Sequence, residues 1–194
     1  MFVSLPFCPG CGGELDGVLE ICRKCLREEK RLWKKAVSVF RMTGTAQELI
    51  HRYKYSNTPE MARPFGKLAA EALIKNGIKV DFIVPTPLHW LRSFLRGFNQ
   101  ATLLAEVISE ETGIPVMDIM KRTKWTKQQA RLSRKERKKN LKGAFSVKKQ
   151  EICKNRSILL LDDVMTTGST LSAAAAELMK AGAHEINVLV LGRR

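Results

Sequence analysis

The sequence contains no long hydrophobic run. Its longest mainly apolar stretches, Ile158 to Leu161 and Ile186 to Leu191, are far shorter than the roughly 20 residues that a membrane-spanning helix needs. The stretch from Met1 to Cys11 also lacks the basic start and apolar centre of a secretory signal. We therefore expect no membrane insertion and a cytoplasmic location.

Acidic residues are almost missing from one part of the chain. Between Lys121 and Lys149 there are thirteen Lys or Arg and one acid, Glu136, so this segment carries +12 of the formal net charge of +15. A concentrated positive field attracts polyanions such as nucleic acid or pyrophosphate. The other interpretation is a solvated surface that keeps the protein soluble.

Cysteine is limited to five residues, and four of them form two Cys-x-x-Cys pairs. The pairs are Cys8 with Cys11 and Cys22 with Cys25, with ten residues between them. This spacing is typical of a zinc ribbon or knuckle with four thiolate ligands, which leaves no open coordination position and makes the zinc structural. Two disulfides are the competing interpretation, which a reducing compartment disfavours. The remaining Cys153 has no partner in sequence and is expected to be a small buried residue.

Strands and helices alternate after the cysteines. With 194 residues and 44% hydrophobic content, the chain can build one domain and a small appendage. Residue patterns predict strands at 36–40, 80–84, 114–117, 158–161 and 186–191, and helices at 46–53, 64–76, 99–112 and 171–181. Thr45 is the expected N-cap of the first helix. The alternation indicates an α/β fold with a mainly parallel sheet and flanking helices at 35–194, preceded by a zinc module and connector at 1–34.

One loop has the residues of an anion site. A buried strand, Ile158 to Leu161, leads into Asp162 and Asp163, and a turn of hydroxyl residues with one glycine, Thr166 to Thr170, then opens a helix. A helix N-terminus leaves backbone N–H groups free and carries partial positive charge, which favours phosphate. Two carboxylates beside a phosphate require hydroxyl donors or a cation, and a ribose diol supplies the hydroxyls. The alternative is an ordinary helix capped by Asp163 or Thr167.

The segment from Leu160 to Thr170 resembles the phosphoribosyl pyrophosphate motif of type I phosphoribosyltransferases. In that family the acidic pair binds the ribose hydroxyls and the threonine-rich loop binds the 5′-phosphate. The resemblance implies catalytic roles for Asp162 and Asp163. It implies phosphoribosyl pyrophosphate contacts from Thr166, Thr167, Gly168, Ser169 and Thr170.

Further motifs are similar to the ComF family, phosphoribosyltransferase-like proteins linked to DNA uptake during natural competence. They are the four cysteines, Val84-Pro-Thr-Pro87, Arg96-Gly-Phe-Asn-Gln100, and Gln129, Arg137 and Asn140 followed by Gly143-Ala-Phe145. This resemblance implies a phosphoribosyl pyrophosphate-binding protein that acts in the uptake or processing of single-stranded DNA. Single-stranded DNA and other competence proteins are its expected partners.

The resemblance also implies a pyrophosphate site and a lid. Pro85, Thr86 and Pro87 match the loop that receives pyrophosphate, and Arg92, Arg96 and Arg131 are implied to neutralise it; two surface arginines are the alternative for Arg92 and Arg96. The basic segment at 121–143 matches the mobile loop that closes over the reacting centre. Mg²⁺ is expected to accompany the ligand, held mainly by pyrophosphate oxygens, ribose hydroxyls and waters.

An active enzyme is the alternative function. It would be a Mg²⁺-dependent phosphoribosyltransferase that moves ribose 5-phosphate to a base or amine and releases pyrophosphate. No residue in the sequence identifies the acceptor.

Overall fold

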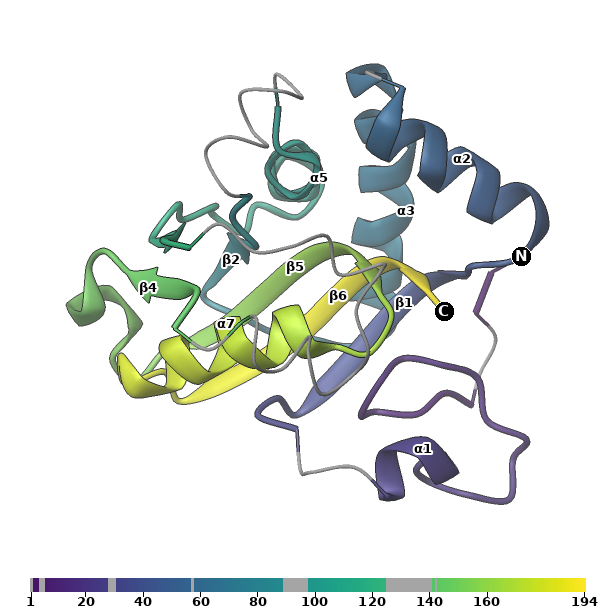
Figure 1. Cartoon of the computed structure of the whole chain (residues 1–194), viewed down its shortest axis with the longest axis horizontal. Coiled ribbons are helices and arrows are strands. Elements are labelled where there is room, and N and C mark those ends of the chain that lie inside the picture. Colours follow the sequence, from purple (N-terminus) through teal and green to yellow (C-terminus); the bar gives the residue numbers. More distant parts are fainter. Residues whose placement is uncertain are drawn as a thin grey trace.

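A parallel sheet of four strands forms the centre of the molecule. The computed structural model describes residues 2–3, 6–27, 31–56, 58–88, 98–124, 141 and 143–194. Across the sheet the order is β1 (Lys35–Arg41), β6 (Glu185–Arg193), β5 (Ser157–Met165) and β2 (Phe82–Pro85), and every neighbouring pair is parallel (Figure 1). The mainly parallel sheet and the flanking helices that the sequence predicts are confirmed.

Helices cover both faces of this sheet. Leu159 and Leu161 of β5 belong to one buried cluster, which the helices α2 (Gly44–Tyr55), α3 (Ala62–Lys75) and α5 (Gln100–Thr112) complete. Ile158 and Leu160 point the other way, into a cluster with α7 (Ser169–Lys180) and the antiparallel ribbon of β3 (Met120–Arg122) and β4 (Phe145–Val147). The described residues also include short helical turns: α1 (Arg23–Leu26), η1 (Pro59–Met61) and η3 (Gln150–Cys153).

Several element ends differ from the prediction. Helix α2 has Thr43 as its N-cap and not Thr45, because Thr43 continues the extended backbone of β1 with φ −138° and ψ 150°. Helix α7 starts at Ser169, two residues before the expected start, and α3 starts at Ala62 directly after η1. Gly113 ends α5 as expected, with a left-handed φ of 73°.

The strand expected at 114–117 is reduced to an isolated bridge. Val116 pairs in parallel with Ile83 of β2, the Ile83 N–H donates to the Pro115 carbonyl at 2.9 Å, and the Met117 N–H donates to the Ile83 carbonyl at 2.8 Å. Pro115 has no N–H, so the ladder cannot extend past it. The sheet therefore has an edge beside β2 that a short segment covers.

The cysteine module packs directly on β1. The Ala36 N–H donates to the Pro9 carbonyl at 2.7 Å, and a Cβ added at Gly12, whose φ is +66°, would lie 2.6 Å from the Ser38 hydroxyl oxygen. Only glycine tolerates both the backbone angle and this close approach. Cys8 and Cys11 are buried in the same cluster as α7, so the module and the sheet share one core. Within the described residues, no helix has both the length and the apolar composition that a membrane span requires.

Candidate functional site

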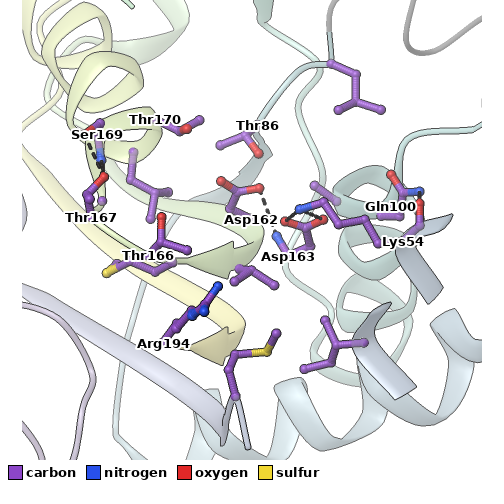
Figure 2. Close-up of a pocket in the computed structure, with 18 of the residues that line it drawn as sticks. Lys54, Thr86, Gln100, Asp162, Asp163, Thr166, Thr167, Ser169, Thr170 and Arg194 are labelled. Carbon is purple, nitrogen blue, oxygen red and sulfur yellow. Dashed lines mark hydrogen bonds and ion pairs between the residues drawn. The ribbon is translucent and has the colours of Figure 1, made fainter. Parts of the chain in front are cut away.

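A cavity of about 760 Å³ lies beyond the C-terminal ends of the strands, where ligands bind in open α/β sheets (Figure 2). The whole segment from Asp162 to Leu171 lines it, together with Thr86 and Pro87 after β2. Its other walls come from α2, from the start of α5 and from Arg194. The cavity therefore gathers the predicted loop with residues that are distant in sequence.

The two acids lie within β5 and not after its end. We expected the strand to stop at Leu161, but it runs to Met165, and Asp162 pairs with Val190 of β6. On the other side β2 ends at Pro85, opposite Leu161, so Asp162 has no β2 residue beside it and faces the cavity. Neighbouring strand residues point to opposite faces, so the two side chains meet different neighbours, but both acids line the cavity and their charges interact.

Asp163 is buried and already holds a cation. Its side chain forms an ion pair with Lys54 at the end of α2, with Nζ to Oδ2 at 2.8 Å and Nζ to Oδ1 at 3.0 Å (Figure 2). Burial opposes the charge on Lys54, but the carboxylate of Asp163 outweighs it and raises the pKa of Lys54 above its usual value. Lys54 carries no sequence signal, since only the folded chain brings it to a residue more than a hundred positions away.

Asp162 is a carboxyl group whose ionised form is disfavoured. Burial, and secondarily the charge of Asp163, raise the pKa of Asp162 to about 7, although Lys54 and the Thr86 hydroxyl act against the rise. Its Oδ1 accepts the N–H of Asp163 at 2.9 Å. A half-buried carboxylate whose ionised form is disfavoured gains free energy from hydroxyl donors or a cation in the cavity. Asp162 is therefore the acid whose chemistry a ligand would change.

The turn between β5 and α7 needs its glycine. Gly168 is the N-cap of α7 with φ 75°, a left-handed conformation, and it caps without a side chain, so neither Asp163 nor Thr167 is the N-cap residue. The hydroxyls of Thr167 and Ser169 lie 2.8 Å apart, and the Ser169 N–H donates to the Thr167 hydroxyl at 3.3 Å. The N-terminus of a helix of 12 residues thus opens beside Asp162, with hydroxyls around it.

The proline loop after β2 is fixed from behind. Pro85 is the last residue of β2, and Thr86 is buried, with its N–H donating to the Leu161 carbonyl at 2.8 Å. The Asn99 side chain donates to the Thr86 carbonyl at 3.1 Å and accepts the N–H of Ala101, which caps α5. Thr86 and Pro87 are therefore presented to the cavity. Asn99 is a positioning residue; the family motif at Arg96–Gln100 contains it, but the sequence did not reveal this role.

Gln100 joins the same arrangement. Its side-chain nitrogen donates to the Lys54 carbonyl at 3.2 Å, and the Tyr53 hydroxyl donates to the Gln100 carbonyl at 2.8 Å. Gln100 is buried, with 2% of its surface exposed. The start of α5 therefore locks the end of α2, which carries Lys54, against the sheet.

Besides Lys54, three cations of the described residues line the cavity, and two of them, Lys24 and Arg194, lie outside the basic segment at 121–143. Lys24, between the second pair of cysteines, and Arg122 of β3 line the cavity, and so does Arg194, whose N–H donates to the Met165 carbonyl at 3.1 Å. The predicted pyrophosphate residues Arg92, Arg96 and Arg131 lie outside the described residues, as does most of the basic segment at 121–143. Their roles stay predictions.

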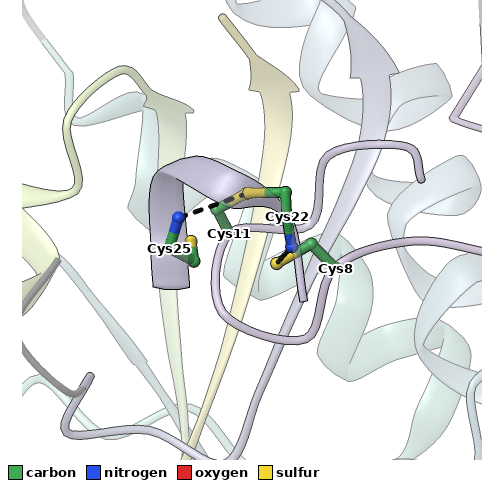
Figure 3. Close-up of side chains that lie close together, drawn as sticks. All are labelled: Cys8, Cys11, Cys22 and Cys25. Atoms are coloured by element: carbon green, nitrogen blue, oxygen red, sulfur yellow. Dashed lines mark hydrogen bonds between the residues drawn. The ribbon is translucent and has the colours of Figure 1, made fainter. Parts of the chain in front are cut away.

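The four predicted zinc ligands come together (Figure 3). The sulfurs of Cys8, Cys11, Cys22 and Cys25 all lie within 4.8 Å of one another, and all five cysteines are free thiols. The Cys11 and Cys22 sulfurs are 3.8 Å apart. A tetrahedral zinc with bonds of about 2.3 Å requires sulfurs about 3.8 Å apart, whereas a disulfide requires about 2.05 Å. The donor set fits a structural zinc.

Backbone donors support the same sulfurs. The Cys22 N–H points to the Cys8 sulfur and the Cys25 N–H to the Cys22 sulfur, each at 3.4 Å. Burial disfavours the Cys11 thiolate, but the Gly13 N–H and Arg193 together lower the pKa of Cys11. The N–H group and the guanidinium therefore favour the thiolate form of Cys11, whereas burial raises the pKa of Cys8 and Cys25.

Comparison with known proteins identifies the family. Residues 53–194 match the model of the phosphoribosyl transferase domain. Competence protein F of Haemophilus influenzae is 38% identical over 98% of this chain and 86% of its own length. The DNA utilization protein YhgH of Escherichia coli is 33% identical over 96% of this chain and 83% of its own length. Competence protein ComFC of Bacillus subtilis is 28% identical over 90% of this chain and 72% of its own length.

Solved structures support the fold. A glutamine phosphoribosylpyrophosphate amidotransferase from B. subtilis matches with a TM-score of 0.50 and 16% identity over 73% of this chain. An allosteric regulatory enzyme of purine biosynthesis matches with a TM-score of 0.51 and 17% identity, also over 73% of this chain. This chain covers 30% of the length of each. Together, the match to the domain model and the similarity along nearly the whole chain show that this protein belongs to the ComF family of competence proteins, with a type I phosphoribosyltransferase fold behind a four-cysteine module.

Proposed function

We propose that this protein binds phosphoribosyl pyrophosphate with Mg²⁺ in the cavity and acts in the cytoplasm in the uptake or processing of single-stranded DNA during natural competence. One observation carries the proposal: Asp162 lines the same cavity as the N-terminus of α7. An anion site and a carboxylate that requires donors fit a ligand with a phosphate at one end and a diol beside it.

Each part of the ligand has a matching part of the cavity. The 5′-phosphate would lie on the turn at 166–170, and the ribose hydroxyls would donate to Asp162. Thr86 and Pro87 would face the pyrophosphate, and Lys24 and Arg194 add cations to the lining of the cavity. Mg²⁺ would bind chiefly to ligand oxygens and waters, and its charge would favour the ionised form of Asp162.

The link to DNA rests on the relatives and on charge. Of the three relatives described above, two are named for competence and one for DNA utilization. In this chain Arg122 lines the cavity and belongs to the β3–β4 ribbon, which joins both ends of the basic segment. A single strand bound along that segment would lie beside the ligand cavity and would contact its phosphates through Lys and Arg.

The cavity itself favours a second function, transfer to an acceptor. It extends past the acids along α2, where Ile50, His51 and Tyr55 line it, and its volume of about 760 Å³ lies within the range of small-molecule sites. The His51 and Tyr55 rings are 4.6 Å apart between centroids. This wall could hold a flat base or amine next to the ribose, as an active phosphoribosyltransferase requires.

Calorimetric titration tests the first function. Phosphoribosyl pyrophosphate titrated into the full chain with Mg²⁺ should give one site, and ribose 5-phosphate alone should bind at least tenfold more weakly because it lacks the pyrophosphate contacts. A single-stranded oligonucleotide should bind the same protein, with an affinity that falls steeply between about 50 and 200 mM salt. Absence of heat with phosphoribosyl pyrophosphate would contradict the proposal.

Pyrophosphate release separates the two functions. Release of pyrophosphate when one of a panel of bases and amines is added would favour the transferase. Intact ligand binding without pyrophosphate release across that panel would favour the binding function over the transferase.

A further inference from the structure

Two arginines hold the carbonyl side of the turn that opens α7. Arg31 donates from Nη2 to the Thr167 carbonyl at 3.2 Å. Arg193 donates from Nη1 to the Met165 carbonyl at 3.2 Å and to the Thr166 carbonyl at 2.8 Å. A turn that presents N–H groups to an anion must direct carbonyls elsewhere, and buried carbonyls need donors. Neither arginine lines the cavity, so both hold the turn from outside it.

Arg31 is itself fixed against the turn. Its guanidinium carbon lies 5.2 Å from the centroid of the Trp33 ring, and its Nη1 lies 3.4 Å from the Ser172 hydroxyl of α7. A Cβ added at Gly168 would lie 3.1 Å from that Nη1. The stacked pair of Arg31 and Trp33 thus packs on Gly168, where the left-handed turn occurs.

The same two arginines reach the cysteine module. The Trp33 ring is 7% exposed, and its N–H donates to the Gly10 carbonyl at 3.1 Å, inside the turn between Cys8 and Cys11. A Cβ at Gly10 would lie 3.1 Å from the Cys25 sulfur, so this turn packs closely around the metal ligands. Arg193 interacts with Cys11, and a Cβ at Gly13 would lie 3.8 Å from its Cγ.

We propose that the zinc module positions the phosphate-binding turn of the cavity through Arg31, stacked on Trp33, and through Arg193, so that zinc retention and ligand binding are coupled. Zinc fixes the Cys8–Cys11 turn, this turn fixes Trp33, and Trp33 holds the arginine that bonds to the Thr167 carbonyl. Coupling of this kind is reciprocal: the ligand must strengthen zinc retention by the factor by which zinc strengthens ligand binding. The inference rests on the proposed function, since the ligand is phosphoribosyl pyrophosphate.

Arg31→Gln tests the central contact, and Lys34→Gln is its matched control. Both remove one positive charge from the same connector, but the Lys34 side chain is 70% exposed and pairs with Glu185 at 2.7 Å. With zinc bound, Arg31→Gln should weaken phosphoribosyl pyrophosphate binding about tenfold, and Lys34→Gln should leave it within about twofold. Equal affinity of Arg31→Gln and the original chain would overturn the proposal.

Zinc release measures the coupling from the other side. Saturating phosphoribosyl pyrophosphate should slow zinc release to a chelating dye at least fivefold in the original chain and by less than half that factor in Arg31→Gln, where only the Arg193 contacts remain. Trp33→Phe keeps a ring under Arg31 but loses the bond to Gly10, so it should reduce this protection while ligand affinity falls less than in Arg31→Gln. A ligand that binds the original chain and leaves its zinc release unchanged would contradict the coupling.

Amide hydrogen exchange separates this inference from the proposed function, because it needs no ligand. Exchange at residues 165–170 should rise at least fivefold in zinc-bound Arg31→Gln, while exchange in the core strands stays unchanged. Unchanged protection of that turn would overturn the positioning role, even if the original chain binds phosphoribosyl pyrophosphate. A rise in exchange without any ligand binding would support the positioning role and reject the proposed function alone.

Discussion

Replacing Asp162 by Asn should make the ligand-free protein more stable at pH 8 and should abolish binding of phosphoribosyl pyrophosphate. The pKa of Asp162 is raised to about 7, so at pH 8 the folded protein carries a buried charge that the unfolded chain exposes to water. Asn keeps an oxygen that accepts the N–H of Asp163 and removes the charge. The expected gain is about 2 kcal/mol in the free energy of unfolding, or about 4–8 °C in the unfolding midpoint.

The gain should depend on pH in a defined direction. Between about pH 4 and pH 7 the folded state binds more protons at Asp162 than the unfolded state, so the original chain loses stability as pH rises through that window. The advantage of Asp162→Asn should therefore be largest at pH 8 and less than half as large at pH 5. Asp118→Asn, at a carboxyl with 74% of its side chain exposed, is the control and should change little. A loss of stability in the Asp162→Asn variant at pH 8 would show that the pKa of Asp162 is not raised.

Replacing Lys54 by Met should destabilise the protein by about 2–3 kcal/mol. The change leaves the buried carboxylate of Asp163, with 11% of its side chain exposed, without its cation, and breaking a buried ion pair from one side is costly. The Lys54 side chain is 27% exposed, which keeps the loss below that of a fully buried pair. Chemical denaturation measures the loss directly.

A second substitution shows whether the loss comes from the ion pair. Asp163→Asn on the Lys54→Met background should restore at least half of the lost stability, because it removes the stranded charge. Lys67→Met is the matched control, since Lys67 pairs with Glu111 at 3.6 Å and both side chains are well exposed, so it should cost less than about 1 kcal/mol. If the double variant is less stable than Lys54→Met, the contact with Lys54 is not what holds Asp163.

Much of the fold was predictable because each element has a local signal. The apolar runs that became β5 and β6, the helix closed by Gly113 and the paired cysteines all depend on neighbours in sequence. The ends of elements were less predictable. The end of β5 is one example, because the β6 backbone continues the ladder past Leu161, and no local pattern marks that.

The candidate site was predictable only in part, for the same reason. The turn at 166–170 and Asp162 could be read from the motif. Lys54 and Arg31 could not, because each acts through a contact that spans more than a hundred residues. Residue alternation along β5 could have shown that Asp162 and Asp163 meet different neighbours, Thr86 for the first and Lys54 for the second, had the strand been drawn through them.

Binding of phosphoribosyl pyrophosphate in the cavity is tested most directly by following the backbone amide resonances of the full chain during titration with the ligand and Mg²⁺. If the ligand binds in the cavity, the largest shifts should occur at residues 162–170, and ribose 5-phosphate should reproduce those at 166–170. Shifts confined to the basic segment at 121–143, with 162–170 unchanged, would show that the ligand binds as a simple polyanion and not in the cavity.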